Sequence, residues 1–211
     1  MKAVGIVGYK NTGKTSLIIK IAEKLSEKYT VGIIKHAERF DEKRSDTQKF
    51  SEMYNTGYVS LKKSGIIFPE ERSLEEMIAY LNIDILLVEG FKDNRSFPKI
   101  TCGGYEDELA IASDEEDIDT IVEKIEEYGF KLANENCGRC GYDCEQMASM
   151  IVHGEATPEQ CQQLSKTEIR VNGKKIQLNK FMGKLVRGVV HGIMDSLSGV
   201  EEGKIEITIE E

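Results

Sequence analysis

Short apolar runs alternate with amphipathic segments along residues 1–130. Over residues 15–29 the apolar positions recur at the spacing of a helix, and residues 117–128 show a second helical pattern with an acidic first turn. Ser73 and Glu76 match a capping box, which predicts that a helix starts there. Apolar runs with the length of buried strands occur at residues 4–7, 31–36, 83–88 and 109–112, and residues 58–61 and 66–68 also look like strands. This alternation predicts an α/β fold, with a mostly parallel sheet and helices on both faces.

The alternation ends where the composition changes, at residues 134–165, which contain four cysteines and few strand signals. We expect these residues to form a separate cysteine-rich segment. Residues 169–178 then contain Val-Asn-Gly-Lys, a strong signal for a two-residue hairpin turn. An amphipathic helix and a strictly alternating strand at 204–210 follow. Residues 166–211 are therefore predicted to form a small α+β region.

The sequence GYKNTGKT between the first strand and the first helix matches the phosphate-binding loop G-x-x-x-x-G-K-[ST] without a mismatch. The glycines allow backbone N–H groups to point at phosphate oxygens, Lys14 can reach the β- and γ-phosphates, and Thr15 can bind Mg²⁺. Lys14 is also a candidate catalytic residue, because phosphoryl transfer depends on charge stabilisation. The candidate nucleotide-binding residues here are Gly8, Asn11, Thr12, Gly13, Lys14, Thr15 and Ser16. Residues 1–130 are thus predicted to be a P-loop NTPase-like nucleotide-binding domain.

The buried strand at 83–88 ends in Glu89 and Gly90. A carboxylate at the end of a strand beside the phosphate loop lies near the metal or the attacking water, so Glu89 is a candidate Mg²⁺ ligand and catalytic group. Asp46, in the polar segment after the second strand, is another candidate Mg²⁺ ligand. Candidate nucleotide contacts at the same edge of the sheet are Lys35, His36 and Lys92. No Asn-Lys-x-Asp motif is present, so these residues do not distinguish GTP from ATP.

Composition narrows the choice of partners and compartment. The 211 residues carry a net charge of −9 and no basic stripe, which argues against nucleic acid as a partner. No apolar stretch approaches the roughly 20 residues that a membrane span needs, and no signal-peptide pattern begins the chain. We therefore expect a cytoplasmic protein whose five cysteines are reduced and serve metal or redox chemistry in preference to disulfides.

The motifs GYKNTGKTS, VGIIKH, ILLVEGFK and FPKI occur in that order. Their order resembles the molybdopterin-guanine dinucleotide biosynthesis adapter family, commonly called MobB, over residues 1–125. The family is similar to the dimeric branch of phosphate-loop GTPases. The resemblance implies GTP binding with weak hydrolysis, a homodimer, and partnership with molybdopterin guanylyltransferase and other cofactor-assembly proteins.

The same resemblance implies roles for individual residues. Gly13, Lys14 and Thr15 would bind the GTP phosphates and Mg²⁺, and Glu89 would lie at the metal or the water. Lys35, His36 and Lys92 fall on motif positions of the family. This chain departs from the family in two features. The spacing between Asp46 and the pair Thr56-Gly57 is longer than usual, and the chain continues well beyond the last helix of short family members.

Cys137, Cys140, Cys144 and Cys161 have the spacing C-x₂-C-x₃-C-x₁₆-C. Four thiolates can bind a structural Zn²⁺ or a [4Fe–4S] cluster. Three close cysteines and one distant cysteine favour the cluster, because zinc sites more often have two close pairs. The segment also resembles the small four-cysteine iron–sulfur domain of anaerobes, which usually has one more residue before its third cysteine, so zinc remains the alternative. We expect Cys102 to be a buried thiol outside this site.

The motifs and the resemblance to the MobB family together imply a GTP-binding adapter in molybdenum or tungsten pterin cofactor biosynthesis, with weak GTPase activity, and the four cysteines favour a [4Fe–4S] cluster. Two other functions remain open. One is a P-loop kinase or ATPase that acts on a small metabolite. The other is an iron–sulfur or metal-delivery protein that uses the nucleotide as a conformational switch.

Overall fold

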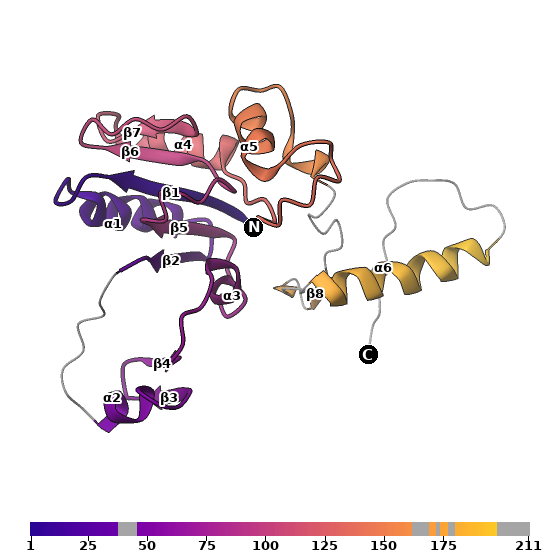
Figure 1. The fold of residues 1–211 in the computed structure, drawn as a ribbon, viewed down its shortest axis with the longest axis horizontal. Coiled ribbons are helices and arrows are strands. Elements are labelled where there is room, and N and C mark those ends of the chain that lie inside the picture. Colours follow the sequence, from indigo (N-terminus) through magenta and orange to yellow (C-terminus); the bar gives the residue numbers. More distant parts are fainter. Residues whose placement is uncertain (38–45, 162–168, 172–173, 177–179, 198–211) are drawn as a thin grey trace. The chain divides into compact units, whose positions relative to one another are not determined.

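The computed structural model describes residues 1–37, 46–161, 169–171, 174–176 and 180–197 (Figure 1). The chain divides into two compact units, Met1–Leu164 and Ser165–Glu211. The four-cysteine segment lies in the first unit, together with the phosphate loop.

A five-stranded sheet, in the order β2-β5-β1-β6-β7, forms the centre of the first unit. All of its neighbouring strands run parallel, and Ile6 in β1 pairs with Glu89 on one side and Ile100 on the other. The strands are β1 Lys2–Gly8, β2 Val31–Lys35, β5 Ile85–Glu89, β6 Lys99–Cys102 and β7 Ala110–Ser113. Because the strands are parallel, their carboxyl ends lie along one edge, where the phosphate loop begins. The sheet confirms the predicted mostly parallel α/β fold.

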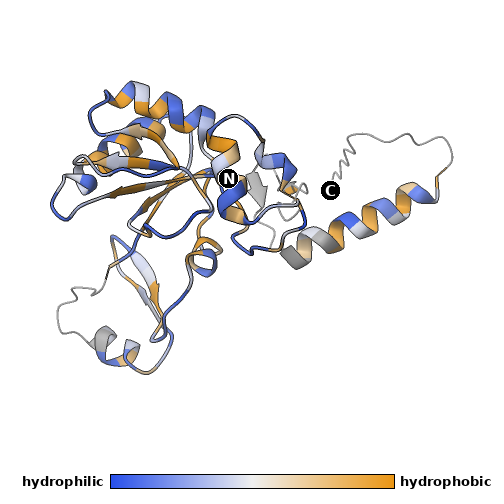
Figure 2. Ribbon diagram, turned by 45° about the horizontal axis from the view of Figure 1, so that its top comes forward, coloured by the Kyte–Doolittle hydropathy of each residue, from blue (hydrophilic) through white to orange (hydrophobic). Residues whose placement is uncertain are grey.

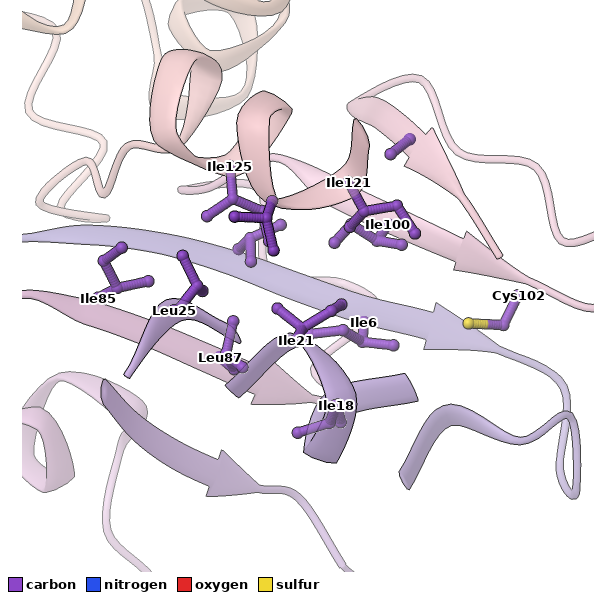
Figure 3. Close-up of a cluster of buried hydrophobic side chains, with 13 residues drawn as sticks. Ile6, Ile18, Ile21, Leu25, Ile85, Leu87, Ile100, Cys102, Ile121 and Ile125 are labelled. Atoms are coloured by element: carbon purple, nitrogen blue, oxygen red, sulfur yellow. The ribbon is translucent and has the colours of Figure 1, made fainter. Parts of the chain in front are cut away.

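Helices cover both faces of this sheet, as the alternation predicted. On one face, α1 (Lys14–Leu25) and α4 (Ile118–Tyr128) pack on the strands through isoleucines such as Ile6, Ile21 and Ile125, each fully buried (Figure 3). On the other face, α3 (Leu74–Ile78) packs against Leu86, Val88 and Phe97. The predicted capping box at Ser73 and Glu76 begins α3. Figure 2 shows the hydrophobic colouring concentrated on these strands and on the inner sides of the helices.

Between β2 and α3, the first unit contains a short helix and an antiparallel hairpin. These are α2 (Asp46–Ser51), β3 (Thr56–Val59) and β4 (Ser64–Ile67). The strands begin two residues earlier than the apolar runs 58–61 and 66–68 predict, because Gly65 pairs with Tyr58 and Thr56 with Ile67.

After α4, an extended segment leads to α5 (Cys144–Val152) and to the 3₁₀ helix η1 (Pro158–Gln160). Asp143 caps α5 and forms a capping box with Gln146. This segment packs around its own apolar cluster, which also includes Leu109 beside the start of β7. The buried members are Leu109, Phe130, Leu132, Met147, Ala148, Ala156 and Cys161. The cysteine segment thus shares its apolar cluster with Leu109, the residue before β7.

The second unit contains the antiparallel hairpin of β8 (Ile169–Val171) and β9 (Lys174–Ile176), as the Asn-Gly turn predicted. The amphipathic helix α6 (Lys180–Asp195) follows, also as predicted. The strand expected at 204–210 lies outside the described residues. Within the described part of the chain, no helix combines the length and the apolar character that a membrane span requires.

Candidate nucleotide site and cysteine cavity

The phosphate loop connects β1 directly to α1, and its backbone conformation depends on particular residues. Gly13 caps α1 with a φ of 81°, in the left-handed region that favours glycine. Gly8 lies against β6, where a Cβ would be only 2.5 Å from the Cys102 carbonyl oxygen. Asn11 also has a positive φ, of 64°, which asparagine tolerates better than most residues. The two motif glycines are therefore required by the turn and by the close approach of the neighbouring strand.

The loop side chains bond within the loop. The Thr12 hydroxyl donates to the Tyr9 carbonyl at 2.9 Å, and the Lys14 ammonium group donates to that same carbonyl and to the Thr12 hydroxyl. Lys14 is thus held over its own loop, at the N-terminus of α1, where the helix dipole favours anions. Ser16, the remaining candidate in this loop, is exposed in the first turn of α1.

Glu89 ends β5 beside the start of α1, and three candidate residues meet there. The Thr15 hydroxyl lies 3.3 and 3.4 Å from the two carboxylate oxygens of Glu89. The Lys35 ammonium group, at the end of β2, lies 3.0 Å from the same carboxylate. A hydroxyl and a carboxylate are oxygen ligands of the kind that Mg²⁺ prefers. The arrangement can therefore hold a divalent cation next to a triphosphate, once Lys35 gives up part of its contact with Glu89.

The chain turns sharply after Glu89. Gly90 has a φ of 89°, and Phe91, which is not a glycine, has a φ of 50°. The Phe91 ring stacks on His36 with the ring centroids 4.6 Å apart, and the buried Lys99 ammonium group donates to the Phe91 carbonyl at 3.2 Å. Burial lowers the pKa of Lys99 to about 8. His36, a candidate nucleotide contact, therefore packs against this turn, and no contact in the described part of the chain joins its side chain to the phosphate loop.

Lys92 follows this turn and lies between two tyrosine rings. Its ammonium nitrogen is 4.5 Å from the ring centroid of Tyr105 and 5.6 Å from that of Tyr9. Tyr9 belongs to the phosphate loop, so the structure brings Lys92 to that loop. The side chain of Asp46, the other candidate Mg²⁺ ligand, lies outside the described part of the structure, and its role stays a prediction.

All four candidate cysteines line one small cavity in the first unit. The other residues of its wall are Leu132, Glu135, Tyr142, Asp143 and Met147. Cys161 is buried, Cys140 and Cys144 are half-buried, and Cys137 is exposed. Within the described residues, no three His, Cys, Asp or Glu side chains form a ready-made site for a metal ion. The thiols therefore share one wall without being preassembled around a single ion position.

The cysteines differ in their positions in the backbone and in their burial. Cys144 is the first residue of α5, directly after the capping residue Asp143. Gly138 and Gly141 have φ values of 64° and 89°, and neither would meet another atom within 4 Å if it carried a Cβ. Cys102, by contrast, is fully buried beside the phosphate loop, and burial raises the pKa of its thiol to about 11. Cys102 is thus the buried thiol that was expected, outside the cavity.

One arginine connects the loop after β5 with the cysteine segment. Arg95 contacts the buried Asp107 carboxylate at 2.9 Å and the Glu145 carboxylate, next to Cys144, at 3.2 Å. The Leu132 N–H, in the wall of the cavity, donates to the Ser96 carbonyl at 2.7 Å. The segment that begins at Glu89 therefore ends in direct contact with the cysteine segment.

Sequence reasoning did not single out Tyr9, Tyr105 or Arg95. Tyr9 stands in the one variable stretch of the phosphate-loop motif, and Tyr105 follows two glycines with positive φ, Gly103 and Gly104. The position of Tyr9 inside the motif is the only signal that could have drawn attention to it. No sequence signal pointed to Arg95, because its partners Asp107 and Glu145 are distant in sequence.

A parallel sheet with its first strand, a glycine loop and its first helix in this arrangement defines the fold of the P-loop nucleoside triphosphatases. Comparison with protein families is more specific. The model of MobB, described as molybdopterin guanine dinucleotide synthesis protein B, matches residues 3–124. A second model, described as "Putative Fe-S cluster", matches residues 132–163. The chain belongs to the MobB family, and it carries the iron–sulfur-type segment in addition.

Individual relatives agree with this assignment. A protein of Methanocaldococcus jannaschii, named "Putative molybdopterin-guanine dinucleotide biosynthesis adapter protein", is 30% identical over 227 residues, which cover 97% of this chain and 95% of the relative. A "Probable molybdopterin-guanine dinucleotide biosynthesis adapter protein" of Bacillus subtilis is 30% identical over 129 residues, or 56% of this chain and 69% of that protein.

Solved structures of MobB proteins are also similar. The crystal structure of Bacillus subtilis MobB has 21% identity and a TM-score of 0.46, and the likeness covers 59% of this chain and 98% of that one. A MobB homologue from Bacillus stearothermophilus has 26% identity and a TM-score of 0.38, and the likeness covers 48% of this chain and 63% of that one.

Proposed function

We propose that this chain is a GTP-binding adapter in the biosynthesis of molybdopterin guanine dinucleotide, the guanylated form of a molybdenum or tungsten pterin cofactor. The observation that carries the proposal is the contact between the Thr15 hydroxyl and the Glu89 carboxylate at the phosphate loop of a MobB-family chain. The Methanocaldococcus jannaschii relative, which is named as such an adapter protein, aligns with almost the whole chain and supports the same role. The partners are then molybdopterin guanylyltransferase and other cofactor-assembly proteins.

In this proposal each group at the edge of the sheet has one task. The backbone and side chains of the loop from Gly8 to Ser16 bind the GTP phosphates, and Lys14 moves from its loop carbonyl to the β- and γ-phosphates. Thr15 and Glu89 hold Mg²⁺, Glu89 directly or through a water that it also orients. Asp46 completes the metal site. Lys35 neutralises Glu89 in the absence of metal and contacts phosphate in its presence.

Hydrolysis by such a site is slow. Phosphoryl transfer is catalysed by positioning and by neutralisation of charge, and an arginine supplied to the transferring phosphate is worth roughly 10³–10⁵ in rate. The phosphate loop contains lysines but no arginine. Rapid turnover would then require a partner that supplies the missing cation, which fits an adapter better than an independent enzyme.

The four cysteines of the cavity are proposed to hold a [4Fe–4S] cluster. Thiolates are the ligands that such clusters require, and the cavity wall collects four of them from two segments of the chain. The match of residues 132–163 to an iron–sulfur family model supports the choice of iron over zinc. A bound cluster would supply one-electron chemistry or structural stabilisation. Cys137, Cys140, Cys144 and Cys161 would be its four ligands.

Calorimetric titration of the anaerobically purified chain with MgGTP and MgATP tests the nucleotide proposal. GTP is expected to bind and ATP to bind much more weakly, and Lys14→Ala is expected to abolish binding of GTP. Tight ATP binding without GTP binding would contradict the adapter role. Rapid turnover with phosphoryl transfer to a small metabolite would instead establish the kinase alternative.

The contacts of Arg95 favour a second candidate function, an iron–sulfur protein switched by its nucleotide. Arg95 belongs to the loop after Glu89 and contacts Glu145, the neighbour of Cys144. A change of this loop on GTP binding would therefore reach the cysteine cavity. The test is the electron paramagnetic resonance spectrum of the reduced protein with GDP and with a non-hydrolysable GTP analogue. Different spectra support the switch, and identical spectra together with identical midpoint potentials contradict it.

A further inference from the structure

Lys92 is a cation without a carboxylate partner among the described residues. Its ammonium group faces the rings of Tyr105 and Tyr9, which meet edge to face with their centroids 5.5 Å apart. Each of the three residues comes from a different loop at the carboxyl edge of the sheet: Tyr9 follows β1, Lys92 follows β5 and Tyr105 follows β6. Because β1 lies between β5 and β6, the three side chains meet over the central strand, beside the phosphate loop.

The backbone that carries Lys92 is held in an unusual conformation. Phe91 has a φ of 50°, in a region that L-residues rarely adopt and that surrounding contacts must maintain. Two contacts do so: the Phe91 ring stacks on His36, and the Phe91 carbonyl accepts a hydrogen bond from the buried Lys99. A Cβ at Gly90 would lie 3.1 Å from the Cβ of His36, so the turn is also tightly packed. The turn brings the chain from Glu89, at the metal end of the site, back over the phosphate loop.

We propose that Lys92 is the residue by which this chain distinguishes a nucleoside triphosphate from a diphosphate, and that Tyr9 and Tyr105 are positioning residues that hold its ammonium group ready. The inference rests on the proposed nucleotide-binding function and adds the part of the ligand that Lys92 recognises, the terminal phosphate. Lys14 serves the β- and γ-phosphates of any bound nucleotide through the loop, whereas Lys92 enters from the strand that carries Glu89.

The rings of Tyr9 and Tyr105 can hold the Lys92 ammonium group in place without neutralising its charge. An ion pair with a carboxylate would cancel the charge that a phosphate needs, whereas ring faces attract an ammonium group and leave its positive charge uncancelled. A terminal phosphate carries more charge than a ring face and would draw Lys92 away from the tyrosines over a short distance. The rings thus fix the direction of Lys92 in the protein without a triphosphate.

The test compares affinities for GDP and for a non-hydrolysable GTP analogue, both with Mg²⁺, in the full chain. Lys92→Ala is expected to lower the preference for the analogue over GDP by about tenfold, the loss of one charge-assisted hydrogen bond. Lys92→Arg should keep most of the preference. Tyr105→Leu is expected to lower it by about threefold, whereas Tyr105→Phe should keep it, because phenylalanine retains the ring face. Lys62→Ala, in the exposed turn between β3 and β4, is the matched control.

The outcomes separate the inference from the function on which it rests. If Lys92→Ala weakens GDP and the analogue equally, or if Tyr105→Phe behaves as Tyr105→Leu does, the inference is overturned while nucleotide binding stands. If the unmodified chain binds neither nucleotide, the proposed function itself fails. The role of Lys92 is established if Lys92→Ala and Tyr105→Leu selectively lose affinity for the analogue while Tyr105→Phe and Lys62→Ala are unchanged.

Discussion

The Thr15 hydroxyl of the phosphate loop contacts the Glu89 carboxylate at 3.3 Å, although 74 residues separate the two in sequence. Their meeting follows from the sheet, because β1 and β5 are parallel neighbours and end at the same edge. The Lys35 ammonium group, 3.0 Å from the same carboxylate, compensates its charge. A divalent cation bound with a triphosphate would take over that compensation.

Glu89→Gln is therefore expected to remove most of the effect of Mg²⁺ on GTP affinity. The amide is neutral, so it does not attract Mg²⁺ and does not compensate its positive charge. The loss of one charged contact corresponds to a loss of about tenfold in Mg²⁺-dependent affinity. Titrations with GTP at several Mg²⁺ concentrations measure the effect. Glu23→Gln, on the exposed side of α1, provides the control. An unchanged Mg²⁺ dependence in Glu89→Gln would remove Glu89 from the proposed metal site.

Two carboxylates share Arg95, and their different burial predicts different consequences. The Asp107 side chain is 2% exposed and also accepts the Leu109 N–H, whereas the Glu145 side chain is 58% exposed. Asp107→Asn is expected to lower the free energy of unfolding by about 2 kcal/mol, because it weakens a mostly buried ion pair. Glu145→Gln should change it by no more than about 0.5 kcal/mol, since exposed pairs contribute little. Urea unfolding of both variants measures the contrast, and equal losses would contradict it.

The cysteine cavity predicts which thiols bind metal. The anaerobically purified chain is expected to be coloured and to hold about four irons, the content of a [4Fe–4S] cluster. Cys140→Ser and Cys161→Ser should lose most of that iron, since each removes a ligand. Cys102→Ser should keep it, because Cys102 lies outside the cavity and burial raises its pKa, which leaves the thiol protonated. Iron and zinc analysis together with the visible spectrum distinguishes an iron–sulfur cluster from zinc. A colourless protein with one zinc per chain would refute the cluster.

Much of the fold could be predicted because apolar periodicity determines which segments are buried. β6 is the exception, although it pairs with β1 at the centre of the sheet. Its sequence, Lys-Ile-Thr-Cys, is short and begins with a lysine, a residue that is almost never fully buried. Only the folded environment accounts for Lys99, which lies 4.0 Å from the Phe97 ring centroid and donates to the Phe91 carbonyl.

The candidate site was predictable to the extent that it depends on strand ends. The proximity of Thr15 and Glu89 follows from a motif and a parallel sheet, and the shared cavity of the four cysteines follows from their spacing. The contacts of Lys92 and Arg95 could not be predicted, because they depend on loop backbones whose direction is fixed by tertiary packing. Asp46 and the strand at 204–210 remain predictions, since the side chain of the first and all of the second lie outside the described residues.

The burial of Lys99 predicts a pH dependence of stability. Burial lowers the pKa of Lys99 to about 8 in the folded protein, below the 10.5 of an exposed lysine. Between these two values the unfolded chain holds a proton that the folded chain has lost, so the contribution of Lys99 to stability rises with pH. From pH 7 to pH 9 the gain is about 1 kcal/mol for this one group.

Lys99→Met removes the titrating group and keeps the length of the side chain, so the difference between the two proteins isolates this effect from all other titrations. The free energy of unfolding of the unmodified protein should rise relative to that of Lys99→Met as the pH increases from 7 to 9. Urea unfolding at pH 7, 8 and 9 measures the difference. Lys20→Met, on the exposed side of α1, should show a constant difference over this range. If the Lys99→Met difference is constant as well, Lys99 titrates as an exposed lysine does and its ammonium group is not desolvated.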